Sequence, residues 1–192
     1  MKLKSNQAVL SGIICLLIAI ILAGYFYFFA NKNVAEKSVD QSSSCPIETE
    51  TRTVRGKSMT GLVEENANIK ILKGYYNCHK VQRGDLIALS YAGNDNPLLK
   101  TIKGIPGDKL DLKNDKEKWQ IEIDGQIVVN SEQKTYELGE KEKEMLALYI
   151  KDYQGKIPPN AYLVLGNLVE GSIDSTRFGL IDKKEILGKA ER

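Results

Sequence analysis

The longest apolar segment of the chain is an uncharged run over residues 8–30. As a helix it would extend roughly 35 Å, enough to cross the hydrocarbon core of a bilayer. Aromatic residues crowd its C-terminal end, and Lys2 and Lys4 precede it. A cleaved secretory signal would have a shorter apolar run, followed by small residues. The pattern therefore predicts an uncleaved transmembrane helix, with residues 1–7 in the cytoplasm and the rest of the chain across the membrane.

Residues 31–52 are polar and rich in serine towards their middle. Such a composition is typical of a linker, so we expect it to separate the anchor from a folded domain over residues 53–192.

Within that domain, short apolar segments are bounded by turn residues, as in β-strands. The expected strands cover residues 85–90 and 161–165, and a hairpin with an Asp124-Gly125 turn covers residues 119–130. Residues 140–152 differ, because a charged half precedes a half with an apolar side. They predict the one soluble helix, whose charges form a solvated face. The expected fold class is mainly β with one soluble helix, plus the N-terminal transmembrane helix.

Composition and charge narrow the classes of partner and cofactor. The net charge is +2 over 192 residues and no basic stripe stands out, so nucleic acid is not an expected partner. A metal site built from Cys45, Cys78 and His79 lacks the usual ligand spacing, and we expect neither a metal nor a cofactor. A Cys45–Cys78 disulfide is the alternative if this part of the chain lies outside the cytoplasm, and the sequence leaves it open.

Two polar residues stand in surroundings that suit nucleophilic catalysis. Ser58 follows Gly56 in a turn-like segment, and Lys100 lies between Leu99 and Ile102 in an apolar stretch. Burial lowers the pKa of a lysine, and a neutral amine can activate a serine. The alternatives are a serine that only makes a turn and a lysine that reaches out to water. A Ser-His-Asp triad would depend on the single histidine, His79, and is poorly indicated.

Four segments in this order resemble the type I signal peptidase family of serine proteases. Val, Gly and a Ser-Met pair occupy residues 54–59, and an Arg-Gly-Asp turn leads into an apolar strand over 83–87. A lysine followed by a Pro-Gly-Asp turn covers residues 100–108. Residues 166–179 hold Gly, then Ser six positions on, then Asp-Ser and an aromatic-Gly pair. The resemblance covers nearly all of residues 8–190 and implies a signal-peptidase-like β fold.

The resemblance also implies roles for individual residues. Ser58 would be the nucleophile and Lys100 the general base, with Ser172 orienting the lysine amine. The backbone N–H of Ser58 would stabilise the oxyanion, since Gly56 stands where some members carry a hydroxyl. Met59 would contact either lipid or the protein core.

The implied reaction is removal of N-terminal signal peptides from exported preproteins through an acyl-enzyme. The substrates would carry small residues before the cleavage site. The lipid bilayer would be a partner, and the secretion machinery is a further candidate. The enzyme would cross the bacterial cell membrane once, with its catalytic domain outside the cytoplasm.

Several positions depart from the family pattern. Gly61 replaces a proline, Thr101 replaces a basic residue, and Asn167 replaces an aspartate. The final arginine falls one place late, at Arg177, behind Thr176. In the family the aspartate and two basic residues form a supporting cluster of ion pairs. Here Asp174 could pair with Arg177, with Lys103 or with neither.

Three rival functions share parts of the pattern. A conjugation or pilin-maturation peptidase would use the same Ser-Lys chemistry on other substrates. A catalytically inactive anchored β module that binds exported proteins is favoured by the altered positions 167 and 177. A self-cleaving repressor is disfavoured by the apolar anchor.

Overall fold

A computed structural model describes Leu22 and residues 45–93, 96–116 and 118–192. Contacts divide the chain into two units, Met1–Ser43 and Ser44–Arg192, and the described strands all belong to the second unit. Apart from Leu22, the predicted anchor over residues 8–30 lies outside the described residues. Within the described part, no helix combines the length and apolar character needed to span a bilayer.

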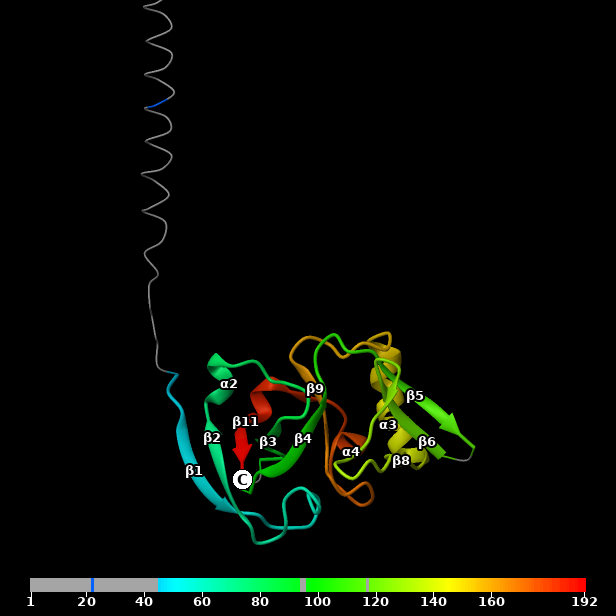
Figure 1. Cartoon of the computed structure of the whole chain (residues 1–192). Helices are drawn as coiled ribbons and strands as arrows, with labels where there is room; N and C mark the ends of the chain where they lie inside the picture. Colours follow the sequence, from blue (N-terminus) through cyan, green and yellow to red (C-terminus); the bar gives the residue numbers. More distant parts are fainter. Residues whose placement is uncertain (1–21, 23–44, 94–95, 117) are drawn as a thin grey trace, which may run out of the picture. The chain divides into compact units, whose positions relative to one another are not determined.

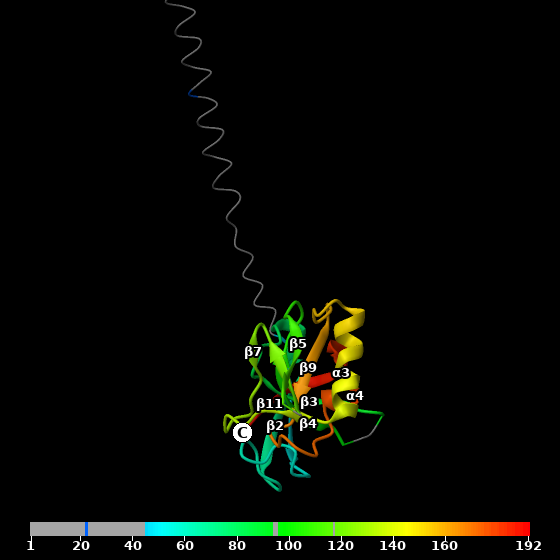
Figure 2. The same ribbon diagram turned by 90° about the vertical axis from the view of Figure 1, so that its right-hand side faces the viewer.

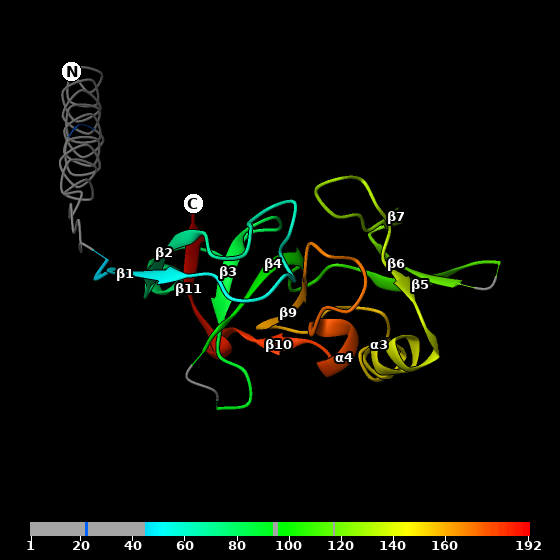
Figure 3. The same ribbon diagram turned by 90° about the horizontal axis from the view of Figure 1, so that it is seen from below.

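The larger of two antiparallel sheets has seven strands in the order β1-β2-β11-β3-β4-β9-β10 (Figure 1). Its strands are β1 (Glu48–Thr53), β2 (Asn68–Lys73), β3 (Leu86–Leu89), β4 (Leu98–Gly104), β9 (Ala161–Leu165), β10 (Ile181–Asp182) and β11 (Ile186–Glu191). The C-terminal β11 is therefore inserted between β2 and β3, and it is seen between them from below in Figure 3.

The second sheet has four strands: β5 (Leu110–Asp115), β6 (Lys118–Ile123), β7 (Gln126–Ile127) and β8 (Glu137–Leu138). The long helix α3 (Glu140–Asp152) packs on β5, on β8 and on the short helix α4 (Ser175–Phe178). Figure 2 shows α3 running along one side of the domain, beside α4. Two further short helices are α2 (Tyr75–Cys78) and the 3₁₀ turn η1 (Lys183–Glu185).

Apolar side chains explain why β4 and β9 lie inside the larger sheet. Leu163, Val164 and Leu165 are fully buried, so β9 presents apolar residues to both faces. Ile102 on β4 is likewise fully buried. Such strands pack between two layers, because every exposed side would leave apolar area in water. Lys100 is thus carried on a strand that is packed on both faces.

The structure confirms the mainly β class, but the one predicted helix is accompanied by α2 and α4, whose four residues each are too few to show an apolar period. The predicted helix and the predicted strand 161–165 coincide with α3 and β9, and β6 and β7 form the hairpin around Asp124-Gly125. The predicted end of the linker is wrong, because residues 48–52 belong to β1. Their Glu and Thr side chains carry no apolar pattern, and the strand forms through pairing with β2.

Cys45 and Cys78 form a disulfide with their Cα atoms 5.9 Å apart. The bond ties the start of β1 to α2, and it removes both thiols from any metal site. His79 stacks on the Tyr75 ring with the centroids 4.0 Å apart.

Candidate active site

Ser58 lies in the loop that joins β1 to β2, beside a buried methionine. Met59 is 1% exposed and packs with Val54 and Ile69, so of its two expected surroundings the structure gives the core. The N–H groups of Leu62 and Val63 both donate to the Met59 carbonyl and close a tight turn. Gly56 turns the chain before the serine with a φ of 86°, a conformation that favours glycine.

Lys100 reaches Ser58 from β4, where it lies opposite Ile87 of β3. Its side chain is 1% exposed, and Nζ donates to Ser58 Oγ at 2.9 Å and to the Leu99 carbonyl at 2.8 Å. Burial lowers the pKa of Lys100 to about 8, and the negative charge of Asp174 opposes part of that shift. A serine hydroxyl and an amine that is partly neutral near pH 7 are thus in direct contact.

Asp174 is 2% exposed and is bound by neutral donors. One carboxylate oxygen accepts from the Gly166 N–H at 2.9 Å. The other accepts from the N–H of Thr176 at 3.1 Å and from its hydroxyl at 2.8 Å, which caps α4. Among the described residues neither Arg177 nor Lys103 forms an ion pair with Asp174. Of the three expected arrangements, the one in which Asp174 pairs with neither cation is therefore found. Lys103 Nζ instead donates to the Val129 carbonyl at 2.7 Å, and burial lowers its pKa.

Ser172 is buried, but its expected hydrogen bond to Lys100 is not formed among the described residues. Within the described part of the chain its hydroxyl has no partner, whereas Lys100 donates to Ser58 and Leu99. Ser172 lies against Gly166: a side chain on that glycine would collide with the Ser172 hydroxyl and approach the Ser58 carbonyl to 2.8 Å. The glycine therefore lets Ser172 and the loop that carries Ser58 come together.

A groove of about 430 Å³ opens beside Ser58. Its walls come from the end of β1, from β2, β3 and the start of β4, and its lining combines polar groups with apolar side chains such as Ile69, Ile71, Ala88 and Leu99. Arg52 and Arg55 are its charged lining residues. Such a groove suits an extended chain with small or apolar side chains better than a highly charged ligand.

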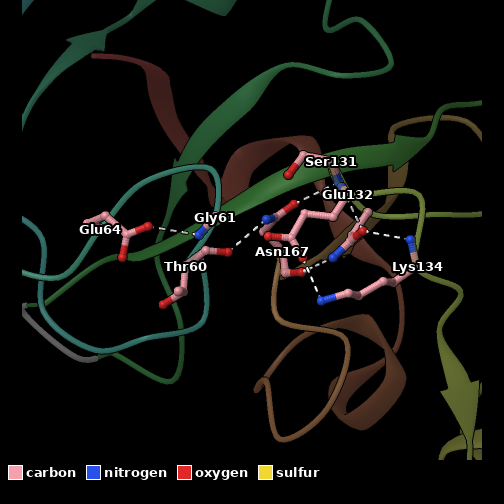
Figure 4. Close-up of polar contacts among 8 residues, drawn as sticks. Thr60, Gly61, Glu64, Ser131, Glu132, Lys134 and Asn167 are labelled. Carbon is pink, nitrogen blue, oxygen red and sulfur yellow. Dashed lines mark hydrogen bonds and ion pairs between the residues drawn. The ribbon is translucent and has the colours of Figure 1, made fainter.

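The sequence did not predict a role for Asn130 or Asn167, although Asn167 stood out as a departure from the family pattern. Asn167 is 3% exposed and its side chain bridges the loop that carries Ser58 to the turn after Asn130 (Figure 4). Asn130 is 5% exposed and donates from Nδ2 to the Asn167 carbonyl at 2.9 Å. Their sequence signal is weak, because the partners are mostly backbone groups.

The glycine at position 61 has a structural reason next to Asn167. Gly61 has a φ of 85°, which a proline ring cannot adopt. A Cβ there would lie 3.1 Å from Asn167 Nδ2 and 2.8 Å from a carboxylate oxygen of Glu132. The two departures from the family pattern at positions 61 and 167 are therefore neighbours in space.

Comparison with known proteins identifies the class. The family described as "Signal peptidase, peptidase S26" matches residues 7–192, which makes this protein a serine endopeptidase. The chain belongs to the signal peptidase family, as its sequence segments suggested, and the family's activity is the removal of signal peptides.

Two relatives by sequence carry the signal peptidase name. Signal peptidase IB of Staphylococcus aureus (strain COL) is 28% identical over 150 residues, covering 71% of this chain and 73% of the relative. Signal peptidase I of Bacillus licheniformis is 29% identical over 143 residues, covering 72% of each chain. Among solved structures, a signal peptidase I from Enterococcus faecalis V583 matches with 24% identity and a TM-score of 0.41, covering 58% of this chain and 97% of that one.

Proposed function

We propose that the protein cleaves signal peptides from exported preproteins by a Ser58/Lys100 dyad. The observation that carries this proposal is the 2.9 Å contact between Lys100 Nζ and Ser58 Oγ on a lysine that is 1% exposed. A buried amine with a pKa of about 8 is neutral in roughly a tenth of molecules at pH 7, which suffices for a general base.

In the first step, neutral Lys100 takes the proton of the Ser58 hydroxyl as Oγ attacks the scissile carbonyl. The protonated amine then gives that proton to the leaving amine, and an ester of Ser58 with the signal segment remains. Lys100 next deprotonates a water, which attacks the ester carbonyl, and the protonated amine returns that proton to the departing Ser58 Oγ, so that the signal segment leaves as a carboxylic acid. The developing oxyanion is held by the Ser58 N–H, for which no internal acceptor is found in the described part of the chain.

Ser172 and Asp174 act behind the dyad in this proposal. The Ser172 hydroxyl, which has no partner among the described residues, orients the amine once Lys100 turns away from the Leu99 carbonyl. Asp174 favours the ammonium that forms during attack, since its charge raises the pKa of Lys100. Gly56 leaves the space beside the oxyanion open, because nothing lies within 4 Å of the position its side chain would occupy.

The substrate segment binds as an added strand along the groove. The end of β1 lies at the edge of the larger sheet and lines the groove, so its backbone groups can pair with an extended peptide. The limited volume of the groove favours small side chains before the cleavage site. In this proposal residues 8–30 anchor the enzyme in the bacterial cell membrane, with the catalytic domain outside the cytoplasm. The anchor confines enzyme and preprotein to one surface, which raises their effective concentration.

Cleavage of a model preprotein by the full chain in detergent tests the dyad. Ser58→Ala and Lys100→Ala should each lower the cleavage rate by at least about 10³-fold. Lys57→Ala, which alters an exposed lysine next to the nucleophile, should cleave at the wild-type rate. Full activity in either dyad variant would refute the assignment.

A second measurement separates the enzyme from a binding module. A serine-directed acylating inhibitor should label the wild type and not Ser58→Ala. A wild type that binds preproteins without cleavage or labelling would instead indicate an inactive anchored β module.

A further inference from the structure

The segment that follows β9 holds the nucleophile loop in place through two hydrogen bonds. The Leu168 N–H donates to the carbonyl of Ser58 at 2.9 Å. One residue earlier, Asn167 Nδ2 donates to the carbonyl of Thr60 at 2.8 Å (Figure 4). The second bond comes from a side chain, so it depends on the identity of residue 167.

The other end of the same amide contacts a turn on the far side. Asn167 Oδ1 accepts from the Ser131 N–H at 3.0 Å, and Figure 4 shows the amide lying between Thr60 and Ser131. The turn is itself held by Asn130, whose Oδ1 accepts from the N–H groups of Glu132 and Lys134, each at 2.9 Å. The amide therefore connects the nucleophile loop to a turn with little freedom to shift.

The two hydrogen-bond partners of the Asn167 side chain require a donor and an acceptor, respectively. The Thr60 carbonyl can only accept a hydrogen bond and the Ser131 N–H can only donate one. A side-chain amide satisfies both at once. An ionised aspartate of the same shape would keep the bond to Ser131 but would place a negative oxygen against the Thr60 carbonyl.

The position of Asn167 along the chain links this amide to the base. Leu165 on β9 pairs with Thr101 on β4, directly after Lys100. Two residues beyond Leu165 the chain reaches Asn167, and the loop that Asn167 holds carries Ser58. The strand beside the base and the loop with the nucleophile are thus joined through residues 166–168.

We propose that Asn167 is a positioning residue, whose neutral amide holds the Thr60 carbonyl and thereby keeps Ser58 Oγ in contact with Lys100 Nζ. This inference rests on the proposed Ser58/Lys100 dyad. Displacement of a reacting group by about 1 Å can cost on the order of 100-fold in rate, so loss of the contact should appear in kcat. Substrate binding in the groove should be little affected, because Asn167 is not among the groove residues.

The test is cleavage of a peptide substrate by the full chain carrying Asn167→Asp or Asn167→Ala. At pH 8.5, Asn167→Asp should lower kcat about 100-fold and Asn167→Ala about tenfold, with KM within twofold of wild type. As the pH falls to 6.5, the ratio of the Asn167→Asp rate to the wild-type rate should rise, because a protonated carboxyl can donate to Thr60. The Asn167→Ala ratio should stay constant over the same range.

Asn114→Asp is the matched control, because it makes the same chemical change at an exposed residue of β5 and should leave kcat unchanged. Thermal unfolding establishes that each variant is folded. If Asn167→Asp does not fold, Asn167→Ala decides. Rates within threefold of wild type, a loss confined to KM, or an Asn167→Asp ratio that does not change with pH would overturn the inference. A wild type that fails to cleave, or an active Ser58→Ala, would instead refute the dyad itself.

Discussion

Replacing Lys100 by methionine should abolish activity and at the same time stabilise the protein at neutral pH. The buried lysine has a pKa of about 8 in the folded state, against an ordinary value of 10.5. At pH 7 this difference corresponds to about 3 kcal/mol of folding free energy, at 1.36 kcal/mol per pKa unit. Methionine occupies a similar volume and carries no charge, so it avoids this cost.

Loss of hydrogen bonds offsets part of the gain. The methionine leaves the Leu99 carbonyl and the Ser58 hydroxyl without the Lys100 donor, at about 1 kcal/mol for each bond. Both acceptors line the groove, where water can replace the amine. We therefore expect Lys100→Met to raise the free energy of unfolding by about 1–2 kcal/mol at pH 7.

The stability advantage of Lys100→Met over the wild type should disappear as the pH rises. Between pH 8 and 10.5 the unfolded lysine holds its proton while the folded one has lost it, so the wild type gains stability with pH. The free-energy cost of burying the charged Lys100 is fully present below pH 8 and is absent above pH 10.5. Between pH 7 and pH 10 the difference between variant and wild type should shift by about 2.5 kcal/mol in favour of the wild type.

Urea unfolding of the full chain in detergent, followed by the fluorescence of Trp119, measures this difference at several pH values. Other ionising groups cancel because they are present in both proteins. Lys57→Met removes an exposed lysine and serves as the matched control for the loss of a lysine. A Lys100→Met variant that is less stable than wild type by the same amount at pH 7 and pH 10 would refute the desolvation argument.

Three further predictions concern the candidate active site and the disulfide. Because Lys100 must be neutral, kcat/KM should fall about tenfold per pH unit below pH 8, and a profile flat down to pH 5 would contradict a lysine base. Asp174→Asn removes the charge that raises the pKa of Lys100, so the acidic limb of that profile should move to lower pH; an unmoved limb would show that the charge does not reach the amine. Breaking the Cys45–Cys78 disulfide, with a sequence separation of 33 residues, should lower the free energy of unfolding by about 3–4 kcal/mol in urea titrations. Equal midpoints with and without reductant would contradict this last prediction.

The sequence predicted those elements whose own residues carry a period or a turn signal. Helix α3 and strand β9 match their predicted bounds, because the first has an apolar side and the second an uninterrupted apolar run. Strand β1 could not be predicted, since its sequence ETETRT has no apolar position. It becomes a strand only because β2 supplies the pairing partner.

For the candidate site, the sequence singled out Ser58 and Lys100, and in the structure Lys100 Nζ donates a hydrogen bond to Ser58 Oγ. The substitutions around them were visible as departures, but their structural outcome was not. Thr176 binds Asp174 through its N–H and hydroxyl, and Asn167 binds a carbonyl and an N–H of distant loops. A hydrogen bond to a backbone group does not depend on the residue type of the partner. The sequence therefore does not reveal where neutral hydrogen bonds replace a network of ion pairs.

The place of β11 between β2 and β3 has a consequence for the timing of biosynthesis. More than a hundred residues separate the end of β2 from the start of β11. At about 5–20 residues per second, a ribosome needs several seconds to make that length. During this interval β2 and β3 each have an edge that is not paired with β11. The wall of the groove that contains both strands has therefore not yet formed. Nascent chains should therefore be inactive and open to chaperones until β11 has emerged, which delays proteolytic activity until the domain is nearly complete.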